Sequence, residues 1–346
     1  MHRLAAPWRR LLLLLPPLAL LRPAASLRAR LPAASETAAL RREEGQAKIF
    51  FLMMSEDGIP LQDIWLDFLS GGKNGENYEV FLHCTDFESC MGAVKRQDIF
   101  QIIPTVPSEY CYNLVDPQLA LVRAALGHVK NPNPHDKFVL VSHNSLPVKP
   151  FWYVYVFFTD HQENTASFFQ SSEWDQSCGL TKASQFSALS WLQADKLVKS
   201  ASNTSRALPN MTVCPGCLDE YFALRAIYGE EQLAKFPKEV PKYMHWQRKF
   251  MWVDFVHKGE FLNAHRSPGT QAEEAAEEDE AKRRRRRGPL GPASFAKITI
   301  PELQEFRNME GVCFARKFLA WTGLQSEGPH GRHALRDAFK KYVYLA

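Results

Sequence analysis

The sequence lacks the short motifs that mark several large enzyme classes. It contains no G-x-G-x-x-G and no G-x-x-x-x-G-K-[ST], which bind nucleotide phosphates, no H-E-x-x-H zinc motif and no G-x-S-x-G nucleophile motif. It also contains no Asp-x-Asp, the simplest carboxylate pair for holding a divalent metal. The sequence therefore carries none of the usual motifs of phosphate-loop nucleotide binding, zinc proteolysis or serine-hydrolase chemistry.

A basic surface on the folded part of the chain is also missing. The 346 residues carry a net charge of +4, yet residues 1–35 hold six arginines and no acid. Residues 273–287 hold six acids followed by six bases and are neutral. Because the first 35 residues alone contribute six positive charges, the rest of the chain is near −2. We therefore predict no nucleic-acid partner, since such a partner needs clustered Lys and Arg on the folded domain.

The N-terminal segment has no apolar run long enough for a straight membrane span. Leu11–Leu21 has eleven residues, whereas a span takes about 20, although snorkelling of Arg22 could extend it to Leu27. Basic residues precede this run, and the small-residue stretch Pro23–Ser26 follows it. A signal peptide, a signal anchor and an organellar transit peptide all remain open for residues 1–35. We favour entry into the secretory pathway, with residues 36–47 as a stem or linker.

Two further features favour the secretory pathway. Asn203 and Asn210 both begin acceptor sequons for N-glycosylation. Seven cysteines suit up to three disulfides with one thiol left over, and the sequence does not define their pairing. They are Cys84, Cys90, Cys111, Cys178, Cys214, Cys217 and Cys313.

Cys214 and Cys217 form a C-x-x-C motif directly before a helical pattern. A redox motif needs its first thiol at a helix N-terminus, where the thiol pKa falls. A structural zinc site would need two more ligands, and no second C-x-x-C exists. In an oxidising compartment, structural disulfides are the favoured interpretation.

Short apolar runs rich in Phe, Val and Ile predict three buried strands, at Lys48–Met54, Tyr78–Cys84 and Phe138–His143. Helical patterns at Leu61–Leu69 and Pro117–Val129 lie between them. This alternation predicts an α/β layer architecture over residues 48–150.

The second half of the chain gives a less complete pattern. Phe151–Phe158 is apolar throughout and has no period that would distinguish helix from strand. Phe186–Ser200 and Leu218–Tyr228 predict helices, and the aromatic-rich segment Tyr243–Phe255 follows. Residues 266–291 hold the charged block with almost no large apolar side chain, so we predict a disordered insert there.

Seven phrases occur in an order that resembles the core-2/I-branching β-1,6-N-acetylglucosaminyltransferase family, in its plant and algal branch. They are FLMMSEDGIPL, FLHCTD, FVLVSHNSLPV, SQFSALSWLQADKLV, CLDEYF, GPASF and GVCFARKF. The resemblance covers about residues 48–318, which we take as the catalytic domain, with 319–346 as a C-terminal tail. It implies a GT-A-like α/β fold with a mixed central sheet flanked by helices, and a UDP-sugar donor with no metal cofactor.

The resemblance also implies roles for individual residues. In inverting transfer a base removes the acceptor proton, and this role falls on Glu220 in the Asp-Glu-aromatic motif. Cations that stabilise the leaving diphosphate fall on Lys297, Arg316 and Lys317. His83 matches a histidine near the nucleotide. Ser184, Gln185 and Trp252 match the acceptor side, where a glycan or glycoprotein would bind.

Each of these residues also has an ordinary structural explanation. Asp219 and Glu220 can complement a helix dipole, His83 can be a satisfied histidine at a strand end, and Trp252 can belong to the core. The sequence also departs from the family pattern. His143 stands where the plant branch has an acidic residue, Gly291 and Pro292 replace His-Pro, and Phe186 follows Ser-Gln where the family has Trp.

We therefore expect a glycosyltransferase of the Golgi or secretory pathway, either type II, with the membrane as a partner through an uncleaved anchor, or luminal. N-acetylglucosamine is one candidate sugar. The alternative is an inactive relative that acts as a sugar-binding or scaffold protein. Binding of a uridine nucleotide would distinguish a formed cationic pocket from an altered one.

Overall fold

A nine-stranded mixed sheet forms the centre of the protein, in the order β3-β2-β1-β4-β9-β6-β10-β12-β5. β3, β2, β1 and β4 are mutually parallel, β9 is antiparallel to both of its neighbours, and β5 is antiparallel at the edge. The strands of this sheet are β1 (Ile49–Ser55), β2 (Tyr78–Cys84), β3 (Phe100–Ile102), β4 (Lys137–Ser142), β5 (Leu146–Pro147), β6 (Ser167–Gln170), β9 (Ser187–Ser190), β10 (Phe250–His257) and β12 (Val312–Arg316). The predicted α/β architecture is confirmed.

The computed structural model describes residues 46–110, 112–159, 167–170, 173–175, 180–183, 185–204, 217–229, 250–257, 294–325 and 331–345. The predicted leader, the sequon at Asn210 and the charged insert 266–291 lie outside these residues. Among the described residues, no helix has both the length and the apolar composition that a membrane span requires.

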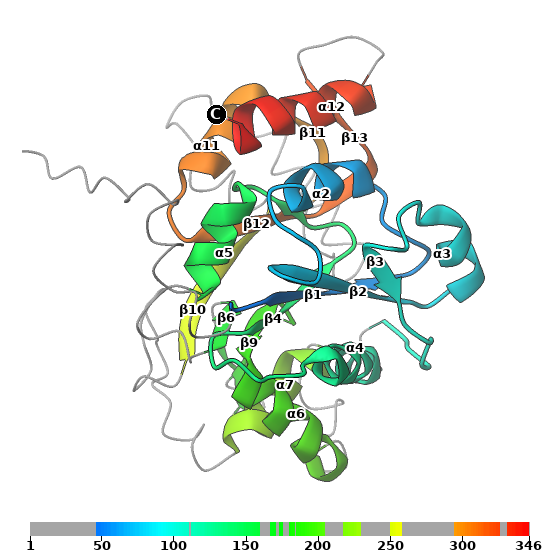
Figure 1. The fold of residues 1–346 in the computed structure, drawn as a ribbon, viewed down its shortest axis with the longest axis vertical. Helices are drawn as coiled ribbons and strands as arrows, with labels where there is room; N and C mark the ends of the chain where they lie inside the picture. Colours follow the sequence, from blue (N-terminus) through cyan, green and yellow to red (C-terminus); the bar gives the residue numbers. More distant parts are fainter. Residues whose placement is uncertain are drawn as a thin grey trace, which may run out of the picture. The chain divides into compact units, whose positions relative to one another are not determined.

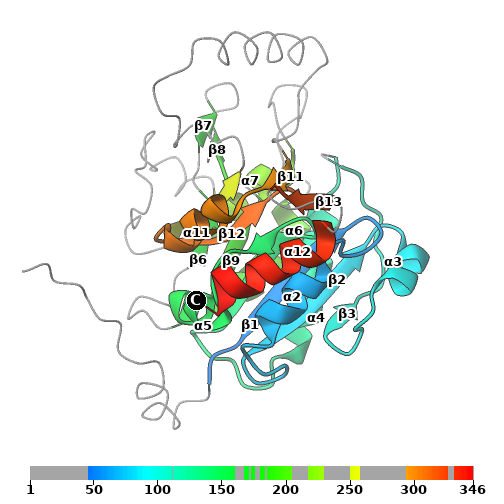
Figure 2. The same cartoon turned by 90° about the horizontal axis from the view of Figure 1, so that it is seen from above.

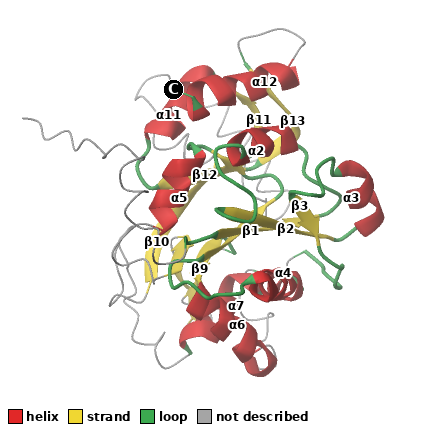
Figure 3. Ribbon diagram, in the orientation of Figure 1, coloured by secondary structure: helices red, strands yellow, loops and turns green. Residues whose placement is uncertain are grey.

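Helices cover both faces of the sheet (Figures 1 and 3). They are α2 (Gln62–Leu69), α3 (Phe87–Ala93), α4 (Val115–His128), α5 (Phe151–Thr159), α6 (Trp191–Thr204), α7 (Asp219–Tyr228), α11 (Ile300–Asn308), α12 (Gly331–Phe339) and the π-helix η1 (Lys340–Tyr344). β1 shows the two faces, because Phe51 and Met53 pack in the core that contains α2, while Phe50 and Leu52 pack in the core that contains α4. A strand buried on both sides needs an unbroken apolar run, which explains the sequence of β1.

The strands and helices predicted in the first half of the chain are present within one or two residues of their predicted bounds, and α7 matches the predicted helix at 218–228. The ambiguous run at 151–158 is the helix α5, which buries Phe151, Val154 and Phe158 at helical spacing. The prediction of one helix over 186–200 is partly wrong. Ser187–Ser190 form β9, fully buried between β4 and β6, and the helix begins only at Trp191.

The segment after residue 318, which we expected to be a tail, is part of the fold. β13 (Phe318–Leu324) pairs with β11 (Phe295–Ile298), and β7 (Glu173–Asp175) pairs with β8 (Leu180–Lys182) in a second small sheet. α12 lies beside α2 (Figure 2), where Arg336 donates two hydrogen bonds to Asp67, of 2.5 and 2.7 Å. Leu335, Phe339 and Val343 are fully buried, so the C-terminal segment completes the core.

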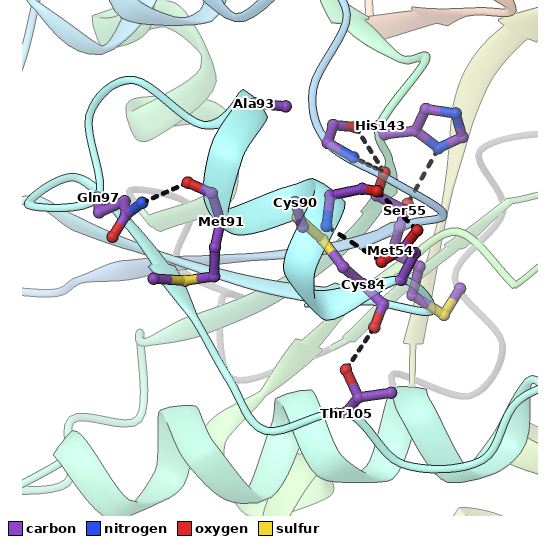
Figure 4. Close-up of a disulfide and its surroundings, with 12 residues drawn as sticks. Met54, Ser55, Cys84, Cys90, Met91, Ala93, Gln97, Thr105 and His143 are labelled. Carbon is purple, nitrogen blue, oxygen red and sulfur yellow. Dashed lines mark hydrogen bonds between the residues drawn. A yellow bond between two sulfur atoms is a disulfide. The ribbon is translucent and has the colours of Figure 1, made fainter.

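One disulfide within the described residues joins Cys84, at the end of β2, to Cys90 on α3 (Figure 4). Cys217 is also disulfide-bonded, and Cys313 is a buried free thiol. These states agree with structural disulfides, which is the interpretation favoured for the C-x-x-C motif.

Candidate functional site

The carboxyl ends of β1, β2 and β4 meet at one edge of the sheet, which we call the carboxyl edge. The chain passes from β1 to β2 and β3 on one side, and then returns to β4 on the other side of β1. In open α/β sheets, ligands bind outside the carboxyl ends of the strands at such a reversal of strand order. Ser55 and Ser142 are the last residues of β1 and β4, and His83 is the last residue but one of β2. A ligand-binding site is therefore expected at this edge.

The turn after β1 is held by Ser55 and Gly58. The Ser55 hydroxyl donates to the Gly58 carbonyl at 2.5 Å and accepts from the Gly58 N–H at 3.0 Å. Gly58 has φ of +144°, and a Cβ there would lie 3.0 Å from the Cβ of Ala93, so glycine is needed. This turn leaves Glu56 and Asp57 exposed at the carboxyl edge.

His83 lies at the carboxyl end of β2 and is almost completely buried. The N–H of Val106 donates to its Nε2 at 3.0 Å, so the proton of the neutral ring sits on Nδ1. Burial lowers the pKa of His83, in agreement with a neutral ring. The nearby hydroxyl of Thr105 donates to the Cys84 carbonyl at 2.7 Å. His83 therefore holds the loop after β3 against β2, which is the structural explanation given above.

Arg316 ends β12 and is buried, with 8% of its surface exposed. Its guanidinium lies over the ring of Phe186, 4.0 Å from the centroid. Its Nε has no hydrogen-bond partner in the described part of the chain. Burial lowers its pKa to about 10, and Tyr110, Glu220 and Asp219 oppose this effect. The two carboxyl groups are therefore near enough to favour the charged guanidinium.

Lys317 follows Arg316 through a cis peptide bond and is half-buried. Its carbonyl accepts from the N–H of Phe295 at 2.7 Å, and the next residue, Phe318, donates its N–H to the Asn144 carbonyl at 2.8 Å. The first bond connects the end of β12 to the start of β11, and the second connects it to the loop that follows β4. Burial lowers the pKa of Lys317, and the Arg316 charge lowers it further. A bound anion would oppose both effects.

Glu220 lies in the first turn of α7, and both its side chain and its main-chain carbonyl accept hydrogen bonds that position that helix. Its Oε2 accepts from the N–H of Cys217 at 3.2 Å, and its main-chain carbonyl accepts from the N–H of Ala183 at 2.8 Å. The second bond places the start of α7 beside the segment that leads to Gln185 and Phe186. The fold brings Glu220 near enough to raise the pKa of Arg316, although the two residues are 96 positions apart in the sequence.

The other predicted site residues are less well defined. Gln185 is partly buried, and its Oε1 has no hydrogen-bond partner among the described residues. Lys297 is exposed on β11, opposite Gly323 of β13. Trp252 occupies a position of β10 opposite Phe169 of β6, and Asn203 lies near the end of α6; the side chains of both are outside the described structure. Ser184 also lies outside the described residues.

The structure adds two residues that our site prediction did not include. His143 follows β4 at the carboxyl edge, and Tyr110, which is 70% exposed, interacts electrostatically with Arg316. The replacement of an acidic residue at position 143 was visible in the sequence, but nothing there placed Tyr110 near Arg316. Within the described residues, no three His, Cys, Asp or Glu side chains are grouped so that they could hold a metal ion.

Comparisons with known proteins do not identify a family for this chain. No protein-family model matches the chain, and no curated protein matches it in sequence. A solved structure of 2-C-methyl-D-erythritol 4-phosphate cytidylyltransferase from Francisella tularensis is similar in part, over 47% of this chain and 82% of that chain. The identity is 9% and the TM-score is 0.29, a similarity too low to support an argument about function.

Proposed function

We propose that this protein is an inverting, metal-independent glycosyltransferase with a GT-A-like fold, which transfers a sugar from a UDP-sugar to a hydroxyl group of a glycan or glycoprotein. The parallel β3-β2-β1-β4 unit supports this fold, because its reversal of strand order forms a site for nucleotide-type ligands. N-acetylglucosamine is the candidate sugar suggested by the sequence resemblance. The secretory-pathway location belongs to the same proposal.

The observation that carries the proposal is the buried Arg316 next to Glu220 at the carboxyl edge. A buried cation without an ion pair is costly, and the described residues contain no ion pair to Arg316 or Lys317. A diphosphate would supply the missing negative charge, and Arg binds such oxygens with its planar fork. The site therefore has the charge that a metal-free transferase needs for its leaving group.

In this proposal Glu220 removes the proton from the acceptor hydroxyl as its oxygen attacks the anomeric carbon. The bond between that carbon and the diphosphate oxygen breaks, and Arg316 and Lys317 stabilise the charge that develops on the leaving UDP. Lys297 reaches the same anion from the exposed strand β11. Gln185, with Ser184 and Trp252, would contact the acceptor.

The first experiment is a screen of UDP and UDP-sugars by thermal shift and by donor hydrolysis. A ligand at 100 times its Kd stabilises the folded state by about 2.7 kcal/mol, which raises Tm by several degrees. We expect UDP to raise Tm equally with and without EDTA. If no uridine nucleotide raises Tm, the donor site is wrong, and if EDTA abolishes binding or transfer, metal independence is wrong.

One observation favours the alternative, a sugar-binding or scaffold relative without catalysis. Glu220 already accepts the Cys217 N–H, so one of its carboxylate oxygens has a structural role at the start of α7. The alternative predicts that the protein binds UDP or a UDP-sugar but neither hydrolyses nor transfers it with any acceptor. Turnover that is lost in Glu220→Gln would contradict this alternative.

A further inference from the structure

His143 lies immediately after β4, beside the last residues of β1. Its main-chain N–H donates to the Met54 carbonyl at 3.0 Å, and its ring Nδ1 lies 3.2 Å from the same oxygen (Figure 4). Because a carbonyl oxygen only accepts hydrogen bonds, Nδ1 carries a hydrogen. The other ring nitrogen, Nε2, has no hydrogen-bond partner among the described residues. The ring is thus held in place by one nitrogen, and the other is left to bind a ligand.

Three charged groups act on this ring, from two different parts of the fold. Burial lowers the pKa of His143, Asp57 and Glu56 in the turn after β1 raise it, and Arg316 at the end of β12 lowers it. On its own segment the nearest polar groups are uncharged, since the Ser142 hydroxyl bonds with Asn144 and Ser145. The free protein therefore holds a neutral ring near pH 7, next to a cation that itself lacks an ion pair.

A bound anion would change this balance. A diphosphate placed against Arg316 would be near His143 as well, because the end of β12 and the loop after β4 are joined by the bond from the Phe318 N–H to the Asn144 carbonyl, at 2.8 Å. Its negative charge would favour the protonated ring, in which Nε2 becomes a second donor.

We propose that His143 is a further donor-binding residue, which donates from Nε2 to the diphosphate of a UDP-sugar and takes up one proton from solvent when the donor binds. The inference rests on the proposed function and deepens it, because it adds a pH dependence to the same site. Thermodynamic linkage between proton binding and donor binding gives the direction in which donor affinity changes with pH. If binding favours the protonated ring, donor affinity increases as pH falls through the pKa of the bound state, by about tenfold for each unit that the ligand raises the pKa.

Isothermal titration of the purified full chain with UDP-N-acetylglucosamine tests the inference between pH 5.5 and 8. Both phosphates of this donor are diesters that do not titrate in the range, whereas a phosphate monoester such as that of free UDP titrates near pH 6. Titrations in two buffers of different ionisation enthalpy give the number of protons taken up. We expect 0.5–1 proton at the maximum, in line with one titrating ring, and a Kd that falls about tenfold from pH 8 to pH 5.5.

Substitutions of His143 test whether the proton that is taken up on donor binding goes to its ring. His143→Gln keeps a hydrogen-bonding side chain but cannot titrate, so we expect proton uptake to vanish and Kd to change less than twofold over the pH range. His143→Asp is expected to weaken binding about tenfold or more at every pH, through repulsion. The matched control is His128→Gln. His128 bonds to Glu79 near the amino end of β2, far along the strand from the site, and its variant should behave as wild type.

Two results would overturn the inference while leaving the proposed function intact. One is donor binding that takes up no proton, and the other is proton uptake that persists in His143→Gln and so belongs to another group, such as His83. Failure of UDP-N-acetylglucosamine to bind at any pH would instead contradict the proposed function and this inference together. If His143→Gln does not fold, NMR of 13C-labelled histidine in the wild type still reports whether the His143 ring titrates at higher pH with the donor bound.

Discussion

The two ends of the parallel strands differ in how their charged side chains are paired. At the amino ends, Lys48 and His128 both bond to the Glu79 carboxylate, at 2.6 and 2.8 Å, and the main-chain N–H of Lys48 donates to Asp136 at 2.8 Å. At the carboxyl edge, the Nε of Arg316 is buried without a partner, and the described residues hold no ion pair for Lys317. Within the described residues, Glu79 at the amino ends is thus paired with cations of the chain, whereas Arg316 and Lys317 at the carboxyl edge have no ion pair.

The largest effect that we predict concerns catalysis at the carboxyl edge. Glu220→Gln retains an oxygen that can accept the Cys217 N–H, but it cannot take a proton. Transfer should fall about 10³-fold, while Kd for the donor and Tm of the free protein change little. Steady-state transfer assays and thermal shift measure the two quantities. Full transfer by this variant would contradict the role of Glu220 as base.

Arg316→Met should separate ligand binding from stability. The cation is lost and an apolar chain remains to pack on Phe186, so donor affinity should fall about 10²-fold. The free protein should be at least as stable as wild type, because a buried charge without an ion pair is removed. Urea unfolding and titration with UDP-sugar test this pair of outcomes. A loss of more than 2 kcal/mol in stability with unchanged binding would assign Arg316 to the amino-end class of charges.

Lys137, at the amino end of β4, is a buried side chain whose effect on stability depends on pH. It begins β4, is fully buried, and burial lowers its pKa to about 7. Between this value and the usual pKa near 10.5, the unfolded chain binds more protons, so the free energy of unfolding rises with pH. Relative to wild type, Lys137→Met should lose about 2 kcal/mol in the free energy of unfolding between pH 7 and pH 9, because only the wild type has this group to titrate. Urea unfolding at both pH values measures it, and a constant difference would contradict the lowered pKa.

The smallest effect concerns the paired charges at the amino ends. Glu79→Gln removes the carboxylate that Lys48 and His128 share, and we expect a loss of about 1–2 kcal/mol in the free energy of unfolding, since both partners are partly exposed. Donor affinity should stay within twofold of wild type. If the variant instead weakened donor binding as strongly as Arg316→Met, the proposed difference in role between the charges at the amino ends and those at the carboxyl edge would be wrong.

Residue patterns predicted much of the first half of the fold. β1, β2 and β4 followed from apolar runs, because a strand buried on both faces needs an apolar residue at nearly every position. The same rule left α5 undecided, since a fully apolar run fits a buried helix as well as a strand. β9 was missed because four residues are too few to show a period of their own, and they run directly into α6.

The site could be predicted only in part. The resemblance named Glu220 and Arg316 as candidates, and the structure places them at the start of α7 and the end of β12. It also named His83, whose Nε2 is occupied by the Val106 N–H. Tyr110 could not be found, because no pattern connects a loop after β3 with the end of β12.

By itself, the sequence determined that β1, β2 and β4 are buried, because burial on both faces leaves a run of apolar residues that can be recognised without knowledge of distant segments. It also determined the chemical types at the site, one carboxylate and several cations without an Asp-x-Asp. Only the tertiary structure decided that Glu220 and His143 are near enough to act on Arg316, and that the Arg316 Nε has no hydrogen-bond partner among the described residues. Pairing of charges depends on distances between segments that are far apart in the chain, and those distances are set by how the strands order themselves in the sheet.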